Sequence, residues 1–182
     1  MRLKDVLPVI LIFLVTGGLL AADHKFVGVA TCKMCHKGQT KGNQFEIWEA
    51  SKHAKAIDGL KTEQALKIAK EKGLTVPPSE APECVKCHTA GFGVDASMFE
   101  AKFDKLQGVQ CEACHGAGAD YKTLTIMKDR AKSIENGMNP ILVSDGTAQK
   151  QCLKCHNSES PVFKGFNFQE YWDKIKHPRP KT

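Results

Sequence analysis

The sequence predicts a mainly α, loop-rich protein with one domain. Its 182 residues suit a single domain. No stretch alternates apolar and polar residues as a half-buried strand would, whereas short helical patterns recur between glycines and prolines. Aromatic residues make up only 7% of the chain, so its side chains alone would form a thin apolar core. We therefore expect another apolar material to fill the interior.

Two helices are expected in the first half of the chain. The first spans Gln39–Ala56, and its apolar residues are Phe45, Ile47 and Trp48. The second spans Glu63–Lys72, because Thr62 can cap its start and Gly73 can end it. An extended linker is expected after it, at Pro77, Pro78 and Pro82.

Three further helices are expected over residues 97–106, 122–136 and 169–176. Ser97 and Glu100 have the spacing of a capping box for the first of these. Gly137 can end the second. The third stops before His177 and Pro178, since the residue before a proline disfavours the helical region.

Residues 1–22 have the order of a secretory signal peptide. Arg2 and Lys4 form a basic start, an apolar run covers 6–20, and two small residues follow at 21 and 22. The alternative is an uncleaved membrane anchor, but the run is shorter than the roughly 20 residues of a spanning helix. We expect an exported domain over 23–182, periplasmic or otherwise extracytoplasmic, with no stable membrane insertion after cleavage.

The eight cysteines form four C-x-x-C pairs, each followed at once by a histidine. An exported chain with this many cysteines would ordinarily suggest disulfides. Only seven of the 182 residues are histidines, however, so four such neighbours are far beyond chance. The pairs are Cys32 and Cys35, Cys84 and Cys87, Cys111 and Cys114, and Cys152 and Cys155; the histidines are His36, His88, His115 and His156.

C-x-x-C-H is the signature of covalent c-type haem attachment. Two thiols reach the two vinyl groups on one edge of a porphyrin, and the adjacent histidine ligates the iron. Zinc sites or disulfides would not need a histidine after every pair. We therefore expect four c-type haems, which would form the core of a multihaem cytochrome c.

The charge of the chain does not predict nucleic-acid binding. The formal net charge is +6, but haem propionates would cancel most of it. Export also argues against a nucleic-acid partner. Lysines near a haem edge could steer an acidic redox partner protein, and a solvated lysine-rich surface is the equally simple alternative.

Each haem needs a ligand on the face opposite its motif histidine, or that face stays open. Three histidines lie outside the motifs: His24, His53 and His177. Four haems therefore cannot all have two histidine ligands from one chain. His53 is expected on a helix, free to reach another haem, and His177 at a helix end. His24, near the mature N-terminus, and Met127 are further candidates.

Four segments resemble the tetrahaem cytochrome c five-fifty-four family. They lie in order between Phe26 and His156, and the run around "SKHAKA" is the most specific. The others are "CVKCHTAGFG", "GVQCEACHGAG" and "QCLKCH". The resemblance implies a mainly helical fold, closely packed haem pairs, and electron transfer from hydroxylamine oxidoreductase.

The resemblance also implies a set of iron ligands. His53 would ligate the third haem opposite His115, and His177 the fourth haem opposite His156. The second haem, on His88, would be five-coordinate. The family pattern has a histidine soon after the third motif that ligates the first haem, but this chain has none there. Its first haem, on His36, would then have Met127, His24 or no distal ligand.

Three functions are compatible with these residues. An electron carrier is favoured, because the chain offers no catalytic residues that stand out beyond the haems. The alternative is a gas-binding protein or a reductase of nitric oxide at an open iron. The third is a subunit of an oligomer or membrane complex, in which His24 reaches a neighbour's haem.

Overall fold

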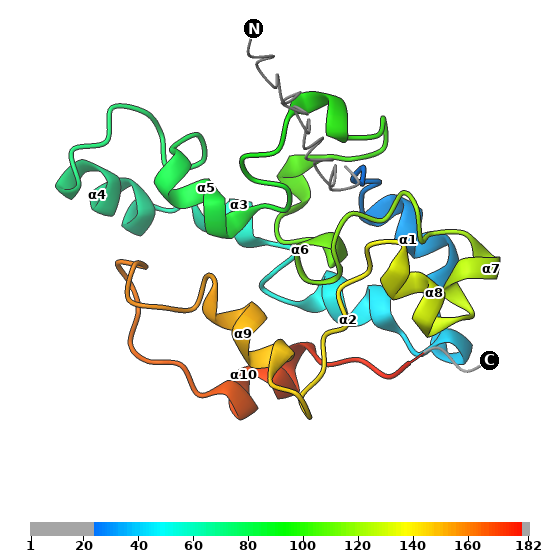
Figure 1. Ribbon diagram of the computed structural model, residues 1–182. Coiled ribbons are helices and arrows are strands. Elements are labelled where there is room, and N and C mark those ends of the chain that lie inside the picture. The colour runs from blue at the N-terminus through cyan, green and yellow to red at the C-terminus, as the bar shows by residue number, and fades with distance from the viewer. Residues whose placement is uncertain (1–23, 180–182) are drawn as a thin grey trace, which may run out of the picture.

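The computed structural model describes residues 24–179, and Figure 1 shows them as short helices joined by long loops. The α-helices are α1 (Val29–His36), α2 (Gln44–Ala50), α3 (Ala56–Gly59), α4 (Glu63–Glu71), α5 (Pro82–His88), α6 (Cys111–His115), α7 (Leu124–Met127), α8 (Arg130–Glu135), α9 (Thr147–Leu153) and α10 (Phe168–Ile175). Three 3-10 turns are η1 (Gln39–Lys41), η2 (Ala96–Met98) and η3 (Lys105–Gln107). Strand-like pairing in these residues is limited to one bridge between Phe26 and Phe99. The predicted helical, loop-rich fold is confirmed.

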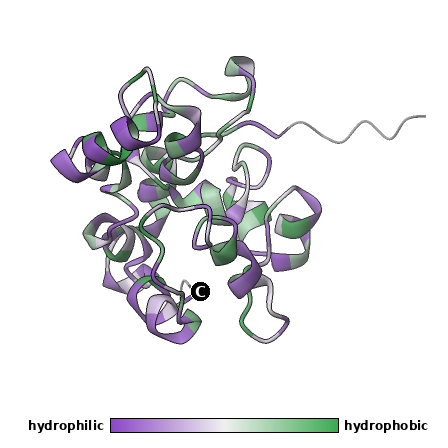
Figure 2. Ribbon diagram, turned by 90° about the vertical axis from the view of Figure 1, so that its left-hand side faces the viewer, coloured by the Kyte–Doolittle hydropathy of each residue, from purple (hydrophilic) through white to green (hydrophobic). Residues whose placement is uncertain are grey.

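The buried side chains of the described residues form a thin core. Four of the ten buried hydrophobic residues are alanines: Ala69, Ala81, Ala90 and Ala148. Figure 2 shows hydrophilic and hydrophobic residues mixed along the helices. Met34, inside the first motif, has 67% of its surface exposed. This interior agrees with the expectation that side chains alone would not fill it.

The N-terminal segment is tied to the middle of the chain. The backbone N–H of Phe26 donates to Met98, and the N–H of Glu100 donates to Phe26, at 2.8 Å each. The Phe26 ring packs against Phe99 and Phe103, with ring centres 5.5 and 5.8 Å away. Figure 1 shows α6 near the middle of the molecule, with α1 on one side and α5 on the other.

The predicted helix over Gln39–Ala56 is wrong as a single element. It is interrupted at Gly42 and Asn43, whose φ angles of 101° and 54° lie in the left-handed region. Such residues cannot continue a right-handed helix. The chain leaves α2 at Ser51, so His53 lies in the turn between α2 and α3 and not on a helix.

Two other predicted helices are also corrected. Over 97–106 the chain forms only η2 and η3, because Phe99 takes an extended conformation to bridge Phe26. Over 122–136 there are two helices, α7 and α8. Asp129 is extended and its carboxylate accepts the N–H of Lys132, which starts a new helix there. In each case a local or tertiary hydrogen bond outweighs the helical pattern.

The remaining predictions hold more closely. The Thr62 hydroxyl accepts the N–H of Ala65 at the start of α4, and Gly73 follows its end with a φ of 70°. α10 ends at Ile175, shortly before Pro178. The proline linker is not extended throughout, because Pro77 accepts two backbone N–H groups in a turn and Pro82 begins α5.

The predicted signal peptide at 1–22 lies outside the described residues. Among residues 24–179, none of the helices has the length and apolar character needed to cross a membrane.

Candidate haem-attachment sites

Each C-x-x-C-H motif lies on a helix or the turn that ends it. α1, α5 and α6 end at the motif histidine, and α9 leads into a turn where the N–H of His156 donates to Cys152 at 2.9 Å. Residues three apart on a helix are neighbours. Both thiols of a motif therefore face the same side, as attachment to one edge of a porphyrin requires. None of the eight cysteines forms a disulfide.

The motifs come together in pairs that are distant in sequence. The Cys32 thiol lies beside Cys111, which raises the Cys32 pKa, so the first motif lies beside the third. Burial raises the pKa of Cys155 to about 12, and Cys87 of the second motif also contributes. Lys86, inside the second motif, forms an ion pair with Glu159 at 2.5 Å. The second motif therefore lies beside the fourth.

A further contact joins the two pairs. The Nε2 atom of Gln151, which precedes Cys152, donates to the carbonyl of Ala113 inside the third motif at 2.6 Å. Burial, with smaller effects of Cys152 and Cys111, raises the pKa of Cys114 to about 11. The spatial order of the motifs is thus first, third, fourth and second.

Two histidines from outside the motifs face motif histidines. The ring centre of His53 lies 6.1 Å from that of His156, and His177 lies 5.9 Å from His115. A metal–imidazole bond is about 2 Å long and the ring centre lies about 1 Å behind the nitrogen, so two imidazoles on one iron have centres about 6 Å apart. Both spacings fit a shared iron.

This pairing differs from the one that the family resemblance implied. His53 faces the fourth motif instead of the third, and His177 faces the third instead of the fourth. The backbone of His53 is held beside the third motif, because its carbonyl accepts the N–H of Val109 at 2.9 Å. Its ring nevertheless lies against His156, so proximity of the backbone does not decide which motif histidine it faces.

Burial keeps these four imidazoles neutral. It lowers the pKa of His115 to about 4 and also lowers the pKa values of His53, His156 and His177. A neutral imidazole is the form that ligates a metal. His156 is also packed by aromatic rings: Phe166 stacks on it with centres 5.0 Å apart and Tyr171 lies 5.5 Å away.

His88 of the second motif has a different environment. Its Nδ1 atom is 2.7 Å from the carbonyl oxygen of Ala56. If Nδ1 carries the proton, Nε2 is left free for iron, and such backbone acceptors orient many metal-ligating histidines. Within residues 24–179, no other aromatic or histidine ring packs against His88, in contrast to His115 and His156.

His36 of the first motif lies near Gln44 and His177. Burial lowers its pKa, His177 lowers it further, and the Gln44 side chain opposes this. His24 and Met127, the candidates for its distal ligand, have other contacts. His24 Nδ1 lies 2.5 Å from an Asp120 carboxylate oxygen, and the Met127 sulfur lies 4.0 Å from the Ser133 hydroxyl.

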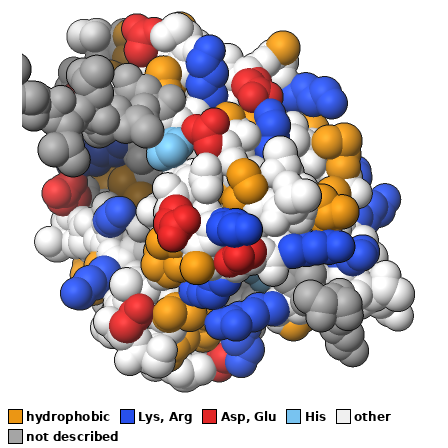
Figure 3. Space-filling model, turned by 45° about the vertical axis from the view of Figure 1, so that its right-hand side comes forward, with side chains coloured by type: hydrophobic (Ala, Val, Ile, Leu, Met, Phe, Trp, Pro, Cys, Tyr) orange, Lys and Arg blue, Asp and Glu red, His pale blue; other side chains and the backbone are white. Residues whose placement is uncertain are grey.

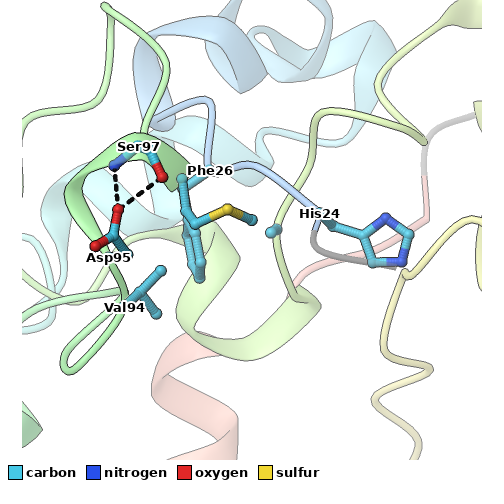
Figure 4. A pocket seen from close by; sticks show the side chains of 7 residues that line it. His24, Phe26, Val94, Asp95 and Ser97 are labelled. Carbon is cyan, nitrogen blue, oxygen red and sulfur yellow. Dashed lines mark hydrogen bonds between the residues drawn. The ribbon is translucent and has the colours of Figure 1, made fainter. Parts of the chain in front are cut away.

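The His24 ring packs closely against the backbone of Gly137. A Cβ atom on Gly137 would lie 2.6 Å from Cδ2 of that ring and 2.7 Å from Nε2. Figure 4 shows the ring directed away from Phe26 and Asp95, which line the same pocket as His24. The described contacts do not bring His24 or Met127 against His36, and their roles as ligands stay predictions.

Two buried polar residues of the site were missed by the sequence analysis. Glu112, inside the third motif, accepts backbone N–H groups of Val27, Gly28 and Gly118 at 2.7–2.8 Å. Gln110 accepts the N–H of Val29 at 2.8 Å. Both hold the start of α1 against α6. A glutamate between two motif cysteines was the available signal, but it gave no indication of burial.

The zinc alternative requires several ligands that converge on one point. Among residues 24–179, no group of three or more His, Cys, Asp or Glu side chains is arranged to hold a bare metal ion.

Known proteins similar to this chain are c-type cytochromes. A family model described as "Cytochrome c554 and c-prime" matches residues 31–116, which include the first three motifs. Cytochrome c-554 of Nitrosomonas europaea is 33% identical over 162 residues, which cover 84% of this chain and 66% of that protein. No solved structure matches the chain. The motif geometry and these similarities lead to one conclusion: the chain belongs to the cytochrome c554 family, a family of c-type cytochromes with covalently bound haem.

Proposed function

We propose that this protein is an exported tetrahaem cytochrome that passes electrons between redox partner proteins. The observation that carries the proposal is the pair of histidine contacts at 6.1 and 5.9 Å, which fit two six-coordinate irons. Haem with two imidazole ligands suits electron transfer, because its coordination is complete in both oxidation states.

Each residue of the site has a role in this proposal. The eight motif cysteines would form the thioether bonds, and His36, His88, His115 and His156 would ligate the four irons. His177 would be a second ligand of the third haem and His53 of the fourth. His24 and Met127 are candidates for the first haem. The contacts between motifs support a route in the order first, third, fourth and second.

The surface fits partners with mixed charge. Figure 3 shows Lys and Arg side chains interspersed with Asp, Glu and hydrophobic side chains on one face of the molecule. Lys86 and Glu159, an exposed ion pair beside the second and fourth motifs, are an example. This pattern favours short-lived docking of a redox protein over nucleic-acid binding.

A second candidate function rests on His88. Its Nδ1 atom is engaged by Ala56, and no described histidine faces its ring. A haem held there would have one face without a protein imidazole, where a small molecule such as nitric oxide could bind. This function could accompany electron transfer in the same molecule.

The two candidates are separated by electron paramagnetic resonance of the oxidised holoprotein, with haems counted by mass. Four haems per chain and at least two low-spin irons support the carrier. A high-spin iron that binds nitric oxide supports the second function as well. Fewer than four haems, or four high-spin irons, would contradict the tetrahaem carrier.

A further inference from the structure

A groove of about 440 Å³ lies between α1, α2 and η3. Its apolar lining includes Val29, Phe45, Trp48 and Leu106. Leu106 is a large hydrophobic side chain, yet 61% of its surface is exposed. Apolar surface that gathers in a solvent-exposed hollow commonly marks an interaction site.

The groove lies on the side of α1 that faces away from the motif cysteines. Ala30 and Lys33 line it, whereas Cys32 and Cys35 do not. Successive residues of a helix are about 100° apart around its axis, so these two pairs of residues lie on opposite faces. The groove is therefore separate from the space that a porphyrin on Cys32 and Cys35 would fill.

The groove is nevertheless close to the first attachment site. A helix with its side chains is about 10–12 Å across, so the two lie within one helix width of each other. Met34 and Cys35, the next two residues after Lys33, are exposed. The attachment edge of the first haem would therefore reach the surface beside the groove.

Printed contacts hold the groove in shape. The Trp48 Nε1 atom donates to the carbonyl of Val109 at 2.8 Å, which fixes α2 against the segment before the third motif. The Lys33 Nζ atom lies 4.4 Å from the centre of the Phe45 ring, a cation–π contact. A surface that is formed before binding loses little conformational entropy when a partner arrives.

Lysines predominate around the groove. Lys33 and Lys55 line it together with one carboxylate, Glu49. Taken together, α1 with its C-cap Lys37, α2 with the turn as far as Lys55, and η3 contain five lysines and two glutamates. Among the residues that the structure describes, none of these five lysines takes part in an ion pair.

The other end of the row of motifs has a different charge. Lys86, inside the second motif, is already paired with Glu159. The lysines at the first end are left to pair with carboxylates of another molecule. Haem propionates would not cancel them, because propionates are on the porphyrin edge opposite to the vinyl groups that the cysteines bind.

We propose that an acidic redox protein docks in the groove between α1, α2 and η3 and exchanges electrons with the first haem. Its carboxylates pair with Lys33 and Lys55, and its apolar side chains cover Leu106. One electron passes between the partner and the iron, so one is oxidised as the other is reduced, and no covalent bond forms or breaks. The inference rests on the proposed tetrahaem function and adds to it the place and charge of one partner.

The test measures electron transfer from a defined acidic protein to the oxidised holoprotein. Reduced flavodoxin of acidic net charge is the probe, and stopped-flow absorbance gives the second-order rate constant. The variant is Lys33→Glu/Lys55→Glu. The matched control is Lys70→Glu/Lys164→Glu, the same change of net charge at exposed lysines outside the groove.

The groove variant should react about tenfold more slowly than the wild type at low ionic strength, because it loses electrostatic steering. The difference should shrink at high ionic strength, where salt screens the charges. Reduction by lumiflavin, a small uncharged reductant, should be the same in all three proteins. Equal rates with flavodoxin in the variant and the wild type, or an equal loss in the control, would overturn the docking site.

Cross-linking of the wild type covers the case in which the variants fail to mature. A water-soluble carbodiimide couples lysine amines to carboxylates that touch them, and mass spectrometry identifies the linked peptides. Links from flavodoxin to Lys33 or Lys55 are expected. Links confined to other lysines would overturn the docking site even if the holoprotein carries four haems. A holoprotein with fewer than four haems would instead overturn the proposed function along with it.

Discussion

The third and fourth motifs face a histidine from outside the motifs, whereas the first and second do not. His177 lies against His115 and His53 against His156, each close to the spacing for one shared iron. His88 contacts a backbone carbonyl, and His36 lies near an amide. The five-residue motif is the same in each case. The difference comes from His53, which lies in the turn between α2 and α3, and His177, which lies in the C-terminal segment.

This contrast separates attachment from coordination. Attachment depends on local spacing within one helical turn, which any of the four motifs provides. Coordination of the opposite face depends on contacts between distant parts of the chain, such as the bond from Val109 to the carbonyl of His53. The motifs with a facing histidine are suited to electron transfer, and the others can differ from them in spin state and in binding.

The largest effect is expected from removing an attachment site at the centre of the molecule. Replacing Cys111 and Cys114 by serine should prevent a stable holoprotein, because the third motif contacts both the first and the fourth. The second motif lies at one end of the spatial order. Replacing its Cys84 and Cys87 should therefore leave a soluble protein with three haems. Mass spectrometry of the purified variants counts the haems. Equal yields of three-haem protein would contradict the spatial order.

The next largest effect is expected from removing one histidine ligand at a time. His53→Ala should convert the fourth haem to high spin, and His177→Ala the third, while the haem count stays at four. The reason is that each variant removes one of two imidazoles from an iron. Paramagnetic resonance with added imidazole measures the change.

Combining each variant with a substitution of a motif histidine identifies which motif histidine shares its iron. His53→Ala should leave the spectrum of the third haem unchanged. The double variant His53→Ala/His115→Ala should therefore change the spectra of two haems, the third and the fourth. If His53→Ala instead removes the signal associated with His115, the pairing that the family resemblance implied is right and the one described above is wrong.

The attachment residues could be predicted from the sequence, but their pairing could not. Four C-x-x-C-H motifs define the cysteines and proximal histidines by local spacing alone. Which histidine faces which motif depends on loop paths, and the helix expected to carry His53 ends at Ala50, because Ser51 is extended. Glu112 and Gln110 were missed because they bind backbone groups distant in sequence.

A smaller effect should come from the polar contact that joins the first and third motifs. Glu112→Gln places an N–H₂ group where a carboxylate oxygen accepts a backbone N–H, so one buried donor loses its partner. We expect the free energy of unfolding to fall by about 1–3 kcal/mol. Denaturant titration of the holoprotein measures it. A Glu135→Gln variant, at an exposed position on α8, is the control and should be near neutral.

The smallest effect is expected at a helix that bears no haem motif. The Thr62 hydroxyl accepts the N–H of Ala65 at 3.3 Å at the start of α4. Thr62→Ala should lower the free energy of unfolding by about 1 kcal/mol, the usual effect of losing a helix cap. The haem spectra should not change, because the α4 cap contacts none of the described iron ligands. A shift in spin state in this variant would show that coordination depends on α4 as well, and the contrast between local attachment and distant coordination would then extend to the helices around the haems.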